Sequence, residues 1–512
     1  MNIEPGSADF AAAYASGRAQ VVWTRVIDDL ETPVSAYLKI AAGRPYAFLF
    51  ESVEGGAWRG RYSIVAMNPD LVWRCRGDLA EIAEGQMLEA GTFSPQAGGA
   101  LDSLRDLVAR TRLDLPAGLP SMAAGLFGAL GYDMIRLTER LPGVNADPIG
   151  LPDAIMIRPS IIAIFDAIAQ EIIIVTTVRP SDASSQDAYG QARRRLRQVV
   201  EDLATPLKRE PERVEPPAAP DPFVSPVSRE AYGVLVERAK EYIRAGDIFQ
   251  VVPSHRFAAP FELDPFALYR SLRRTNPSPF LFYLNYPGFQ LVGSSPEILV
   301  RLRDGKITIR PIAGTRRRGA TPAEDAALEA ELLADPKERA EHLMLLDLGR
   351  NDVGRVAMLR HTGRNTPPSA TDRPSVRVTE SFVIERYSHV MHIVSNVEGD
   401  APEGVDPVDV LMAALPAGTL SGAPKVRAME IIDELEEVKR GIAYAGAVGY
   451  FGADGSVDTC IVLRTALCKD GMMYVQAGGG VVADSDPVAE YEETVQKSRA
   501  LRRAAAEAWR FA

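Results

Sequence analysis

A proline-rich stretch divides the chain and constrains its fold more than any other feature of the sequence. Seven prolines lie between Thr205 and Ser228, interleaved with charged side chains. Such a stretch cannot pack a hydrophobic core, so we expect an extended connector there. The chain is therefore predicted to form an amino-terminal region over 1–204, a linker over 205–225 and a carboxy-terminal domain over 226–512.

The carboxy-terminal part combines clear helix starts with many short strands. Ser228 is predicted to cap a helix that Gly246 ends. Thr321-Pro322 and Asp335-Pro336 each join a capping side chain to a proline and a nearby glutamate, which is typical of a helix start. The pattern favours an α+β architecture with large mixed or antiparallel sheets flanked by helices. Strand candidates are 289–292, 298–302, 307–312, 392–397, 447–451, 459–463 and 474–477.

Composition excludes several classes of protein. The formal net charge of -11 argues against nucleic acid or an anionic membrane as a partner, because the summed field repels both. The most apolar stretch, Ser160 to Val178, is interrupted by Asp166, Gln170 and Glu171, so two adjacent strands explain it better than a membrane span. The first nine residues lack an export signal, and we expect a cytoplasmic protein.

Two predicted helices carry pairs of acids at helical spacing. Glu338 and Glu341 share one face of the helix that begins at Pro336. Asp486-Pro487 predicts the start of a second helix by the same signals, and Glu490 and Glu493 repeat the spacing there. Four clustered carboxylates repel one another unless a cation neutralises them, and hard oxygen donors suit Mg²⁺. Alone, each pair is more typical of a solvated helix face, and Lys497 is a ready surface partner for Glu493.

Basic residues and glycine-rich turns are candidate anion-binding sites in this acidic chain. Arg464 lies inside a strand candidate, and Lys425 follows a glycine-containing turn. Gly478 to Gly480 end another strand, where bare backbone N–H groups could bind a carboxylate, although a plain flexible turn is the simpler interpretation. His392 opens a strand, a position that is more often structural. No serine or cysteine lies in a nucleophile elbow, so covalent acyl chemistry has no support.

Six longer strings resemble the chorismate-utilising enzymes and appear in that family's order. Six strings of this length are not a coincidence, so this resemblance is favoured over the solvated helix face and the flexible turn. The amino-terminal part is similar to the tryptophan-sensing region of the family's anthranilate-forming members. The strings are GDIFQVV from Gly246, GSSPE from Gly293, RPIAGTRRRG from Arg310, EHLMLLDLGRND from Glu341, PAGTLSGAPK from Pro416 and QAGGG from Gln476.

The resemblance implies a set of site residues. It makes Glu341 and Glu493 the Mg²⁺ ligands, with Glu338 and Glu490 acting through waters. It places one chorismate carboxylate on the metal and the other on Arg464, Tyr444 and the backbone of Gly478, Gly479 and Gly480, with Gly314 and Thr315 at the ring. It gives catalytic or positioning roles to His392, Glu297, Thr419, Gln250 and Lys425.

The implied reaction adds ammonia beside the ring carboxylate, releases the C4 hydroxyl and eliminates pyruvate to give anthranilate. Water-using members carry a lysine base where this chain has Gln250, which favours ammonia. Relatives that make aminodeoxychorismate, the alternative product, typically carry a lysine where this chain has Ala313.

The resemblance also implies a partner and a regulator. The chain shows no glutaminase signature, so a separate glutamine amidotransferase subunit should supply the ammonia. Feedback inhibition by L-tryptophan is implied by a second set of residues, and the chain departs from familiar versions near 59–63, which leaves the strength of inhibition open. The set consists of Glu51, Ser52, Pro279, Phe280, Leu281 and Tyr450.

Overall fold

The computed structural model describes residues 1–52, 60–143, 145–207, 222–358, 375–387 and 390–512. Most of the expected linker, 208–221, lies outside the described residues. Within the described residues, no helix has both the length and the apolar character needed to cross a lipid bilayer.

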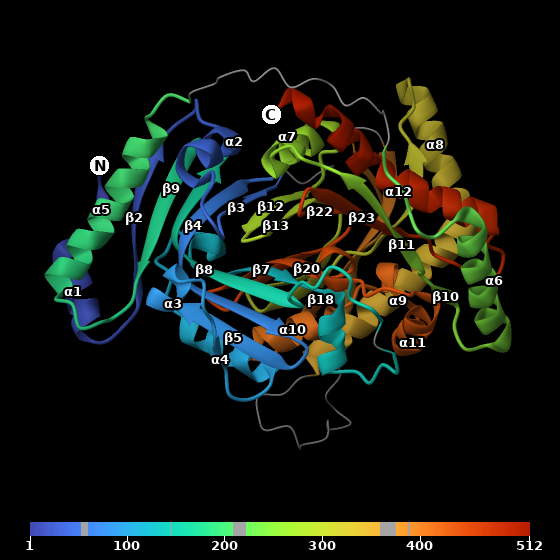
Figure 1. Cartoon of the computed structure of the whole chain (residues 1–512), viewed down its shortest axis with the longest axis horizontal. Coiled ribbons are helices and arrows are strands. Elements are labelled where there is room, and N and C mark those ends of the chain that lie inside the picture. The colour runs from blue at the N-terminus through green and yellow to red at the C-terminus, as the bar shows by residue number, and fades with distance from the viewer. Residues whose placement is uncertain (53–59, 144, 208–221, 359–374, 388–389) are drawn as a thin grey trace.

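Strands from both sides of the proline-rich segment belong to one hydrogen-bonded network. β3 (Phe48–Glu51) pairs with β12 (Phe280–Tyr286), and β7 (Gly125–Leu130) pairs with β20 (Ala447–Gly452). In Figure 1 the strands form the interior, with α1 (Ser7–Ala15) and α5 (Ser185–Leu203) along one side. On the opposite side lie α6 (Arg229–Ala245), α8 (Pro322–Ala334) and α12 (Pro487–Glu507). The boundary in the sequence is therefore crossed by backbone hydrogen bonds in the fold.

The remaining elements before residue 205 build the sheet on which α1 and α5 pack. Long apolar strands dominate, because β-branched side chains suit a pleated surface buried on its faces. The principal elements are β1 (Ile3–Glu4), β2 (Gln20–Ile27), α2 (Pro33–Ala36), β4 (Tyr62–Arg76), β5 (Leu79–Glu84), α3 (Gln86–Glu89), β6 (Ser94–Pro95), α4 (Ala100–Thr111), β8 (Ala154–Asp166) and β9 (Glu171–Val178).

The elements after residue 221 carry most of the motif residues. They are α6 (Arg229–Ala245), β10 (Gln250–Val251), β11 (Ser254–Pro260), α7 (Pro265–Thr275), β13 (Phe289–Ser295), β14 (Ile298–Arg303), β15 (Lys306–Ile309), β16 (Ile312–Arg317), α8 (Pro322–Ala334), α9 (Pro336–Ala357), β17 (Arg377–Arg386), β18 (Val390–Asp400), α10 (Pro407–Ala414), β19 (Gly422–Ala423), α11 (Lys425–Leu435), β21 (Val457–Ile461), β22 (Thr465–Lys469), β23 (Met472–Gly478) and α12 (Pro487–Glu507).

The expected fold class is confirmed. Every pairing between the named strands of the described residues is antiparallel, as in β16 with β18 and β11 with β23. The predicted helix starts are also confirmed: the side chain of Ser228 accepts a hydrogen bond from the backbone of Ala231, and Thr321 accepts one from Glu324. Gly246 ends α6 with a φ of 86°, a left-handed conformation that glycine adopts without strain.

Two strand predictions were wrong in detail. The expected strand over 307–312 is two strands, β15 and β16, because Arg310 and Pro311 interrupt it and proline has no N–H to donate to a ladder. Arg464 does not lie in a strand. It occupies the break between β21 and β22 with a φ of 48°. A non-glycine residue is uncommon in that region, and such strain often marks a functional position.

Candidate functional site

The acidic pairs lie at the first turns of α9 and α12. Asp335 caps α9 by accepting hydrogen bonds from the backbone N–H groups of Lys337 and Glu338 at 2.9 and 3.3 Å. Asp486 caps α12 in the same way through the Ala489 N–H at 2.8 Å. These caps fix the backbone from which the glutamates extend, and the positive end of each helix dipole favours negative charge there.

Glu341 and Glu490 are the more buried members of the acidic set. Burial raises the pKa of Glu341, and the charges of Glu338 and Glu493 raise it further. Burial also raises the pKa of Glu490, while a hydrogen bond from Ser485 at 2.6 Å opposes that shift. The negative charge of Glu493 on α12 acts on Glu341 of α9, so the acidic starts of the two helices lie near each other.

Glu338 and Glu493 have cationic partners. Arg316 donates to Glu338 at 3.1 Å, and Lys497 forms an ion pair of 2.7 Å with Glu493. Both side chains of the second pair are nearly half exposed, so this surface pair contributes little stability and can open at low cost.

The donor set fits a hard divalent cation. Among the described residues no three acidic, histidine or cysteine side chains already converge on one point. Within the same residues, however, the buried Oε2 of Glu490 and Oε1 of Gln250 have no hydrogen-bond partner. Mg²⁺ needs only one or two carboxylates when waters and substrate oxygens complete its shell, so the four carboxylates of Glu338, Glu341, Glu490 and Glu493 are sufficient to hold one ion.

The glycine triplet, Gly478 to Gly480, lies directly against the side chains of the acidic set and its neighbours. A Cβ on Gly479 would lie 2.9 Å from Oε2 of Glu490, and one on Gly480 would lie 2.6 Å from Nε2 of Gln250. A Cβ on Gly478 would lie 2.8 Å from the Tyr444 hydroxyl. The close approach explains why glycine is required beside the carboxylates. The Gly479 N–H donates to the Tyr232 hydroxyl and to the Pro253 carbonyl oxygen, both at 3.2 Å, which fixes the backbone there. The structure thus brings the triplet against Glu490 and Gln250 of the expected site.

His392 stands on β18 opposite Thr315 of β16. Its Nδ1 lies 3.0 Å from the Thr315 hydroxyl and 3.2 Å from the Gly314 carbonyl oxygen. Burial, and then the charge of Arg464, lower the pKa of His392 to about 4. The imidazole is therefore neutral at pH 7. A proton on Nδ1 that is donated to Gly314 leaves the Nε2 lone pair available for proton transfer.

The pKa of Glu297 is raised, whereas that of His392 is lowered. Burial raises its pKa to about 8, although the Ile312 N–H, the Thr419 hydroxyl and the charge of Arg464 all lower it. Thr419 donates to Oε2 of Glu297 at 3.4 Å. At neutral pH this carboxyl group holds a proton, so the site places a proton donor near the neutral base His392.

Arg464 lies beside both groups. Burial lowers its pKa, while the negative charges of Glu297 and Tyr387 act in the opposite direction. No group in the described part of the chain forms a hydrogen bond or an ion pair with its guanidinium. A buried cation without a partner is costly, which favours an anionic ligand here.

Lys425 differs from the other expected site residues. Its ammonium donates to both carboxylate oxygens of Asp352 at 2.9 Å, and to the Ala414 carbonyl oxygen at 3.3 Å. Both side chains of the ion pair are buried. The pair joins α9 to the start of α11.

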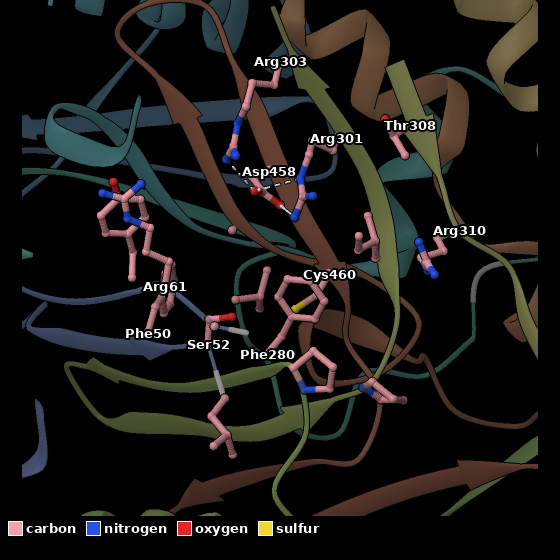
Figure 2. A pocket seen from close by; sticks show the side chains of 18 of the residues that line it. Phe50, Ser52, Arg61, Phe280, Arg301, Arg303, Thr308, Arg310, Asp458 and Cys460 are labelled. Atoms are coloured by element: carbon pink, nitrogen blue, oxygen red, sulfur yellow. Dashed lines mark hydrogen bonds and ion pairs between the residues drawn. The ribbon is translucent and has the colours of Figure 1, made fainter. Parts of the chain in front are cut away.

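The six residues expected to bind tryptophan line one cavity of about 830 Å³. Figure 2 shows Ser52 and Phe280 on one wall, with Arg301 and Arg303 turned toward Asp458 on another. The Glu51 carboxylate already has two hydrogen-bond donors: its Oε2 accepts from the Tyr269 hydroxyl and from the Arg273 guanidinium, the latter at 2.8 Å. Positions 53–59 lie outside the described residues.

Sequence reasoning missed several residues around these sites. Arg301 and Arg303 lie two apart on β14 and share one face, a spacing that could have indicated a cavity wall. Tyr387 was also missed, although it lies five residues before His392. Its ring contact with His392 is a tertiary contact that no local pattern reveals.

Comparisons with known proteins agree with this geometry. Residues 69–503 match the family model described as chorismate binding enzyme. Anthranilate synthase component 1 of Cereibacter sphaeroides is 57% identical over 506 residues, which cover 98% of each chain. The protein of the same name from Pseudomonas putida is 48% identical over 484 residues, 93% of each chain.

Solved structures give the same picture. The crystal structure of anthranilate synthase component I from Streptococcus pneumoniae TIGR4 has a TM-score of 0.74 at 34% identity, covering 93% of this chain and 99% of that chain. MenF, the menaquinone-specific isochorismate synthase from Escherichia coli, has a TM-score of 0.68 at 18% identity, covering 98% and 100%. The second likeness shows a shared fold.

Proposed function

Since the chain belongs to the chorismate binding enzymes, on the branch of anthranilate synthase component I, we propose that it converts chorismate and ammonia to anthranilate, pyruvate and water. The observation that carries the proposal is the 57% identity over 98% of the chain to a protein of that name. The charge of Arg464 acts on both Glu297 and His392, and this grouping of a cation, a proton donor and a neutral base supports the proposal chemically.

Substrate binding would use both halves of the site. Chorismate is a dicarboxylate, and the unpartnered guanidinium of Arg464 offers a bidentate anchor for one carboxylate. The backbone of the Gly478–Gly480 turn and the Tyr444 hydroxyl, whose oxygen has no hydrogen-bond partner among the described side chains, would complete that anchor. The other carboxylate would lie toward the acidic helix starts.

Glu341 and Glu493 would hold Mg²⁺, with Glu338 and Glu490 behind them through waters. When bound, the ion supplies positive charge that neutralises the carboxylates and binds a substrate carboxylate. The support is the raised pKa of Glu341, which comes from burial and from the neighbouring negative charges. For Glu493 to take part, its exposed ion pair with Lys497 must open.

His392 and Glu297 would move the protons. The C4 hydroxyl needs a proton to leave as water, and the ring must lose one to become aromatic when pyruvate departs. His392 would assist departure of the hydroxyl, while the protonated Glu297 would shuttle protons, with Thr419 holding its carboxyl group. Thr315 and Gly314 fix the imidazole.

The choice of nucleophile rests on Gln250. Its amide lies 3.5 Å from Glu341 and cannot deprotonate water, which favours ammonia as the attacking molecule. Ala313 offers no amine to attack the ring, which favours anthranilate over the alternative product aminodeoxychorismate. A separate glutamine amidotransferase subunit would supply the ammonia in the cell.

Feedback inhibition by L-tryptophan would act from the cavity of about 830 Å³. Asn276 precedes the cavity residues Pro279 to Leu281, and its carbonyl oxygen accepts a hydrogen bond from Ser294 at 2.6 Å. The Ser294 N–H donates to the carbonyl oxygen of Arg464 at 3.2 Å. A ligand that displaces residues 276–281 would therefore also displace the backbone of Arg464, the proposed substrate-binding residue.

The test is direct. Purified chain is incubated with chorismate, MgCl₂ and an ammonium salt, and anthranilate is followed by its fluorescence. We expect anthranilate and pyruvate in equal amounts with ammonium, and no turnover when glutamine replaces it. Accumulation of a non-aromatic amino product would instead assign the chain to aminodeoxychorismate synthesis.

A further inference from the structure

Tyr387 lies between the cavity and the proposed catalytic centre. Its ring packs edge-on against the His392 imidazole, with ring centroids 5.6 Å apart and planes at 65°. Tyr387 also lines the cavity, so one side chain touches both sites. Its negative charge, if formed, would also act on Arg464, which places the phenol near that guanidinium.

The phenol is held from the cavity side. The Tyr387 hydroxyl donates to Oε2 of Glu385 at 2.8 Å, and the other oxygen of Glu385 pairs with Arg310. Arg310 also forms an ion pair with Glu380 at 3.1 Å. Glu385 is buried, and all four residues line the cavity; Figure 2 shows Arg310 on its wall. A hydrogen bond to a buried carboxylate is among the stronger ones, so the ring has a defined direction.

The backbone of Tyr387 is clamped as well. Arg318 donates to its carbonyl oxygen at 2.7 Å, and Asp325 holds Arg318 through two hydrogen bonds of 2.9 Å. The Tyr387 N–H donates to the Val390 carbonyl oxygen at 2.8 Å. With both ends fixed, the ring forms a rigid wall against the imidazole.

We propose that Tyr387 is a positioning residue for His392, held in place by Glu385 and Arg310. Thr315 and Gly314 hold only Nδ1 of the imidazole, so the ring can still tilt about that anchor. The Tyr387 ring blocks this tilt and directs Nε2 at the substrate. The inference rests on the proposed function, because it concerns proton transfer by His392.

The first experiment separates turnover from binding. In Tyr387→Phe we expect kcat for ammonia-dependent anthranilate formation to fall about tenfold, the equivalent of one hydrogen bond to a charged group, with KM for chorismate within about twofold. Glu385→Gln should behave alike. Tyr242→Phe is the matched control, since Tyr242 donates to Glu434 at 2.6 Å and Glu434 pairs with Arg238 on the surface. It should retain the wild-type kcat.

Two double-mutant cycles test the route. If Glu385 acts through the phenol, Tyr387→Phe combined with Glu385→Gln should lose no more than about twofold beyond either single variant. If Tyr387 acts through His392, Tyr387→Phe should cause no further loss in a His392→Asn background, where fluorescence is followed over hours to measure the residual rate. Thermal melting confirms that every variant is folded.

The outcomes separate the two proposals. Wild-type kcat in Tyr387→Phe, or losses that multiply in either cycle, would overturn the inference and leave the proposed function standing. Absence of anthranilate formation by the wild-type chain would overturn the proposed function, and with it this inference.

Discussion

Glu297 and Arg464 show how single residues acquire chemistry from the fold. The sequence motifs indicate which residues matter, and α9 and α12 present the expected glutamates where helical spacing predicted them. The sequence could not predict the φ of 48° at Arg464, because that conformation is imposed by the strands on either side. Nor could it predict the Tyr387 contact with His392, which depends on how β18 pairs with its neighbours.

The shifted pKa of Glu297 predicts a pH-dependent stability difference. The folded chain retains a proton on Glu297 up to about pH 8, whereas the unfolded chain releases it near the ordinary value of 4.5. The contribution of this group to stability therefore falls as pH rises from about 4.5 to 8. Glu297→Gln does not ionise, so its melting temperature relative to wild type should increase from pH 5 to pH 9. A difference that is constant with pH, measured by calorimetry, would contradict the assignment.

The acidic set predicts the consequence of losing one ligand. Glu341→Ala or Glu493→Ala should lower kcat/KM at least about 100-fold, because the ion in such a site contributes several kcal/mol. Mg²⁺ should raise the melting temperature of the wild-type chain but not of Glu341→Ala. Glu492→Ala is the control and should remain active. Glu492 lies on α12 next to Glu493, but its exposed carboxylate pairs with Arg229. Full activity of Glu341→Ala without added metal would exclude this ligand.

The cavity predicts a variant with altered regulation only. Ser52→Phe places a bulky ring where Ser52 faces the cavity, so tryptophan should inhibit at least about tenfold less strongly while ammonia-dependent kcat is kept. Inhibition curves at fixed chorismate measure the effect. An unchanged curve would place tryptophan elsewhere.

At the scale of elements, local signals predicted where helices begin better than where strands lie. Asp335-Pro336 and Asp486-Pro487 begin α9 and α12 as expected, because a cap and a proline act within one turn. The strands β12 and β17 were not predicted. Strand stability comes from partners distant in sequence, so a short window of residues carries little information about it.

The cap of α12 predicts a linked loss of stability and metal affinity. Asp486→Ala should cost about 1 kcal/mol, since the Ala489 N–H loses its acceptor. The first turn carrying Glu490 and Glu493 should then fray, and the Mg²⁺ concentration for half-maximal activity should rise. Asp264→Ala is the control, because Asp264 caps α7 through the Phe266 N–H but α7 carries no metal ligand. An equal rise of the Mg²⁺ requirement in both variants would refute the link.

At the scale of the whole molecule, the proline-rich segment is a boundary in sequence while the fold is shared across it. β12 and β20 each have one partner from before residue 205, β3 and β7 respectively. The cavity takes Glu51 and Ser52 from one side and Tyr450 from the other. Composition predicts a connector, but it could not predict that strands from before and after it pair, because pairing between strands more than 200 residues apart leaves no local pattern.

Because strands from the two sides of the proline-rich segment pair, removing residues 1–225 and cutting the chain within the segment should have opposite results. A fragment spanning 226–512 would expose the edges of β12 and β20 together with buried side chains such as Phe282 and Val448. Unpaired apolar edges favour aggregation, so we expect no cooperative melting and no activity. The full chain cut by a protease at a site inserted within 208–221 after folding should elute as one species and keep its kcat, because the strand pairs persist. A monomeric, active 226–512 fragment would show instead that the two regions are independent.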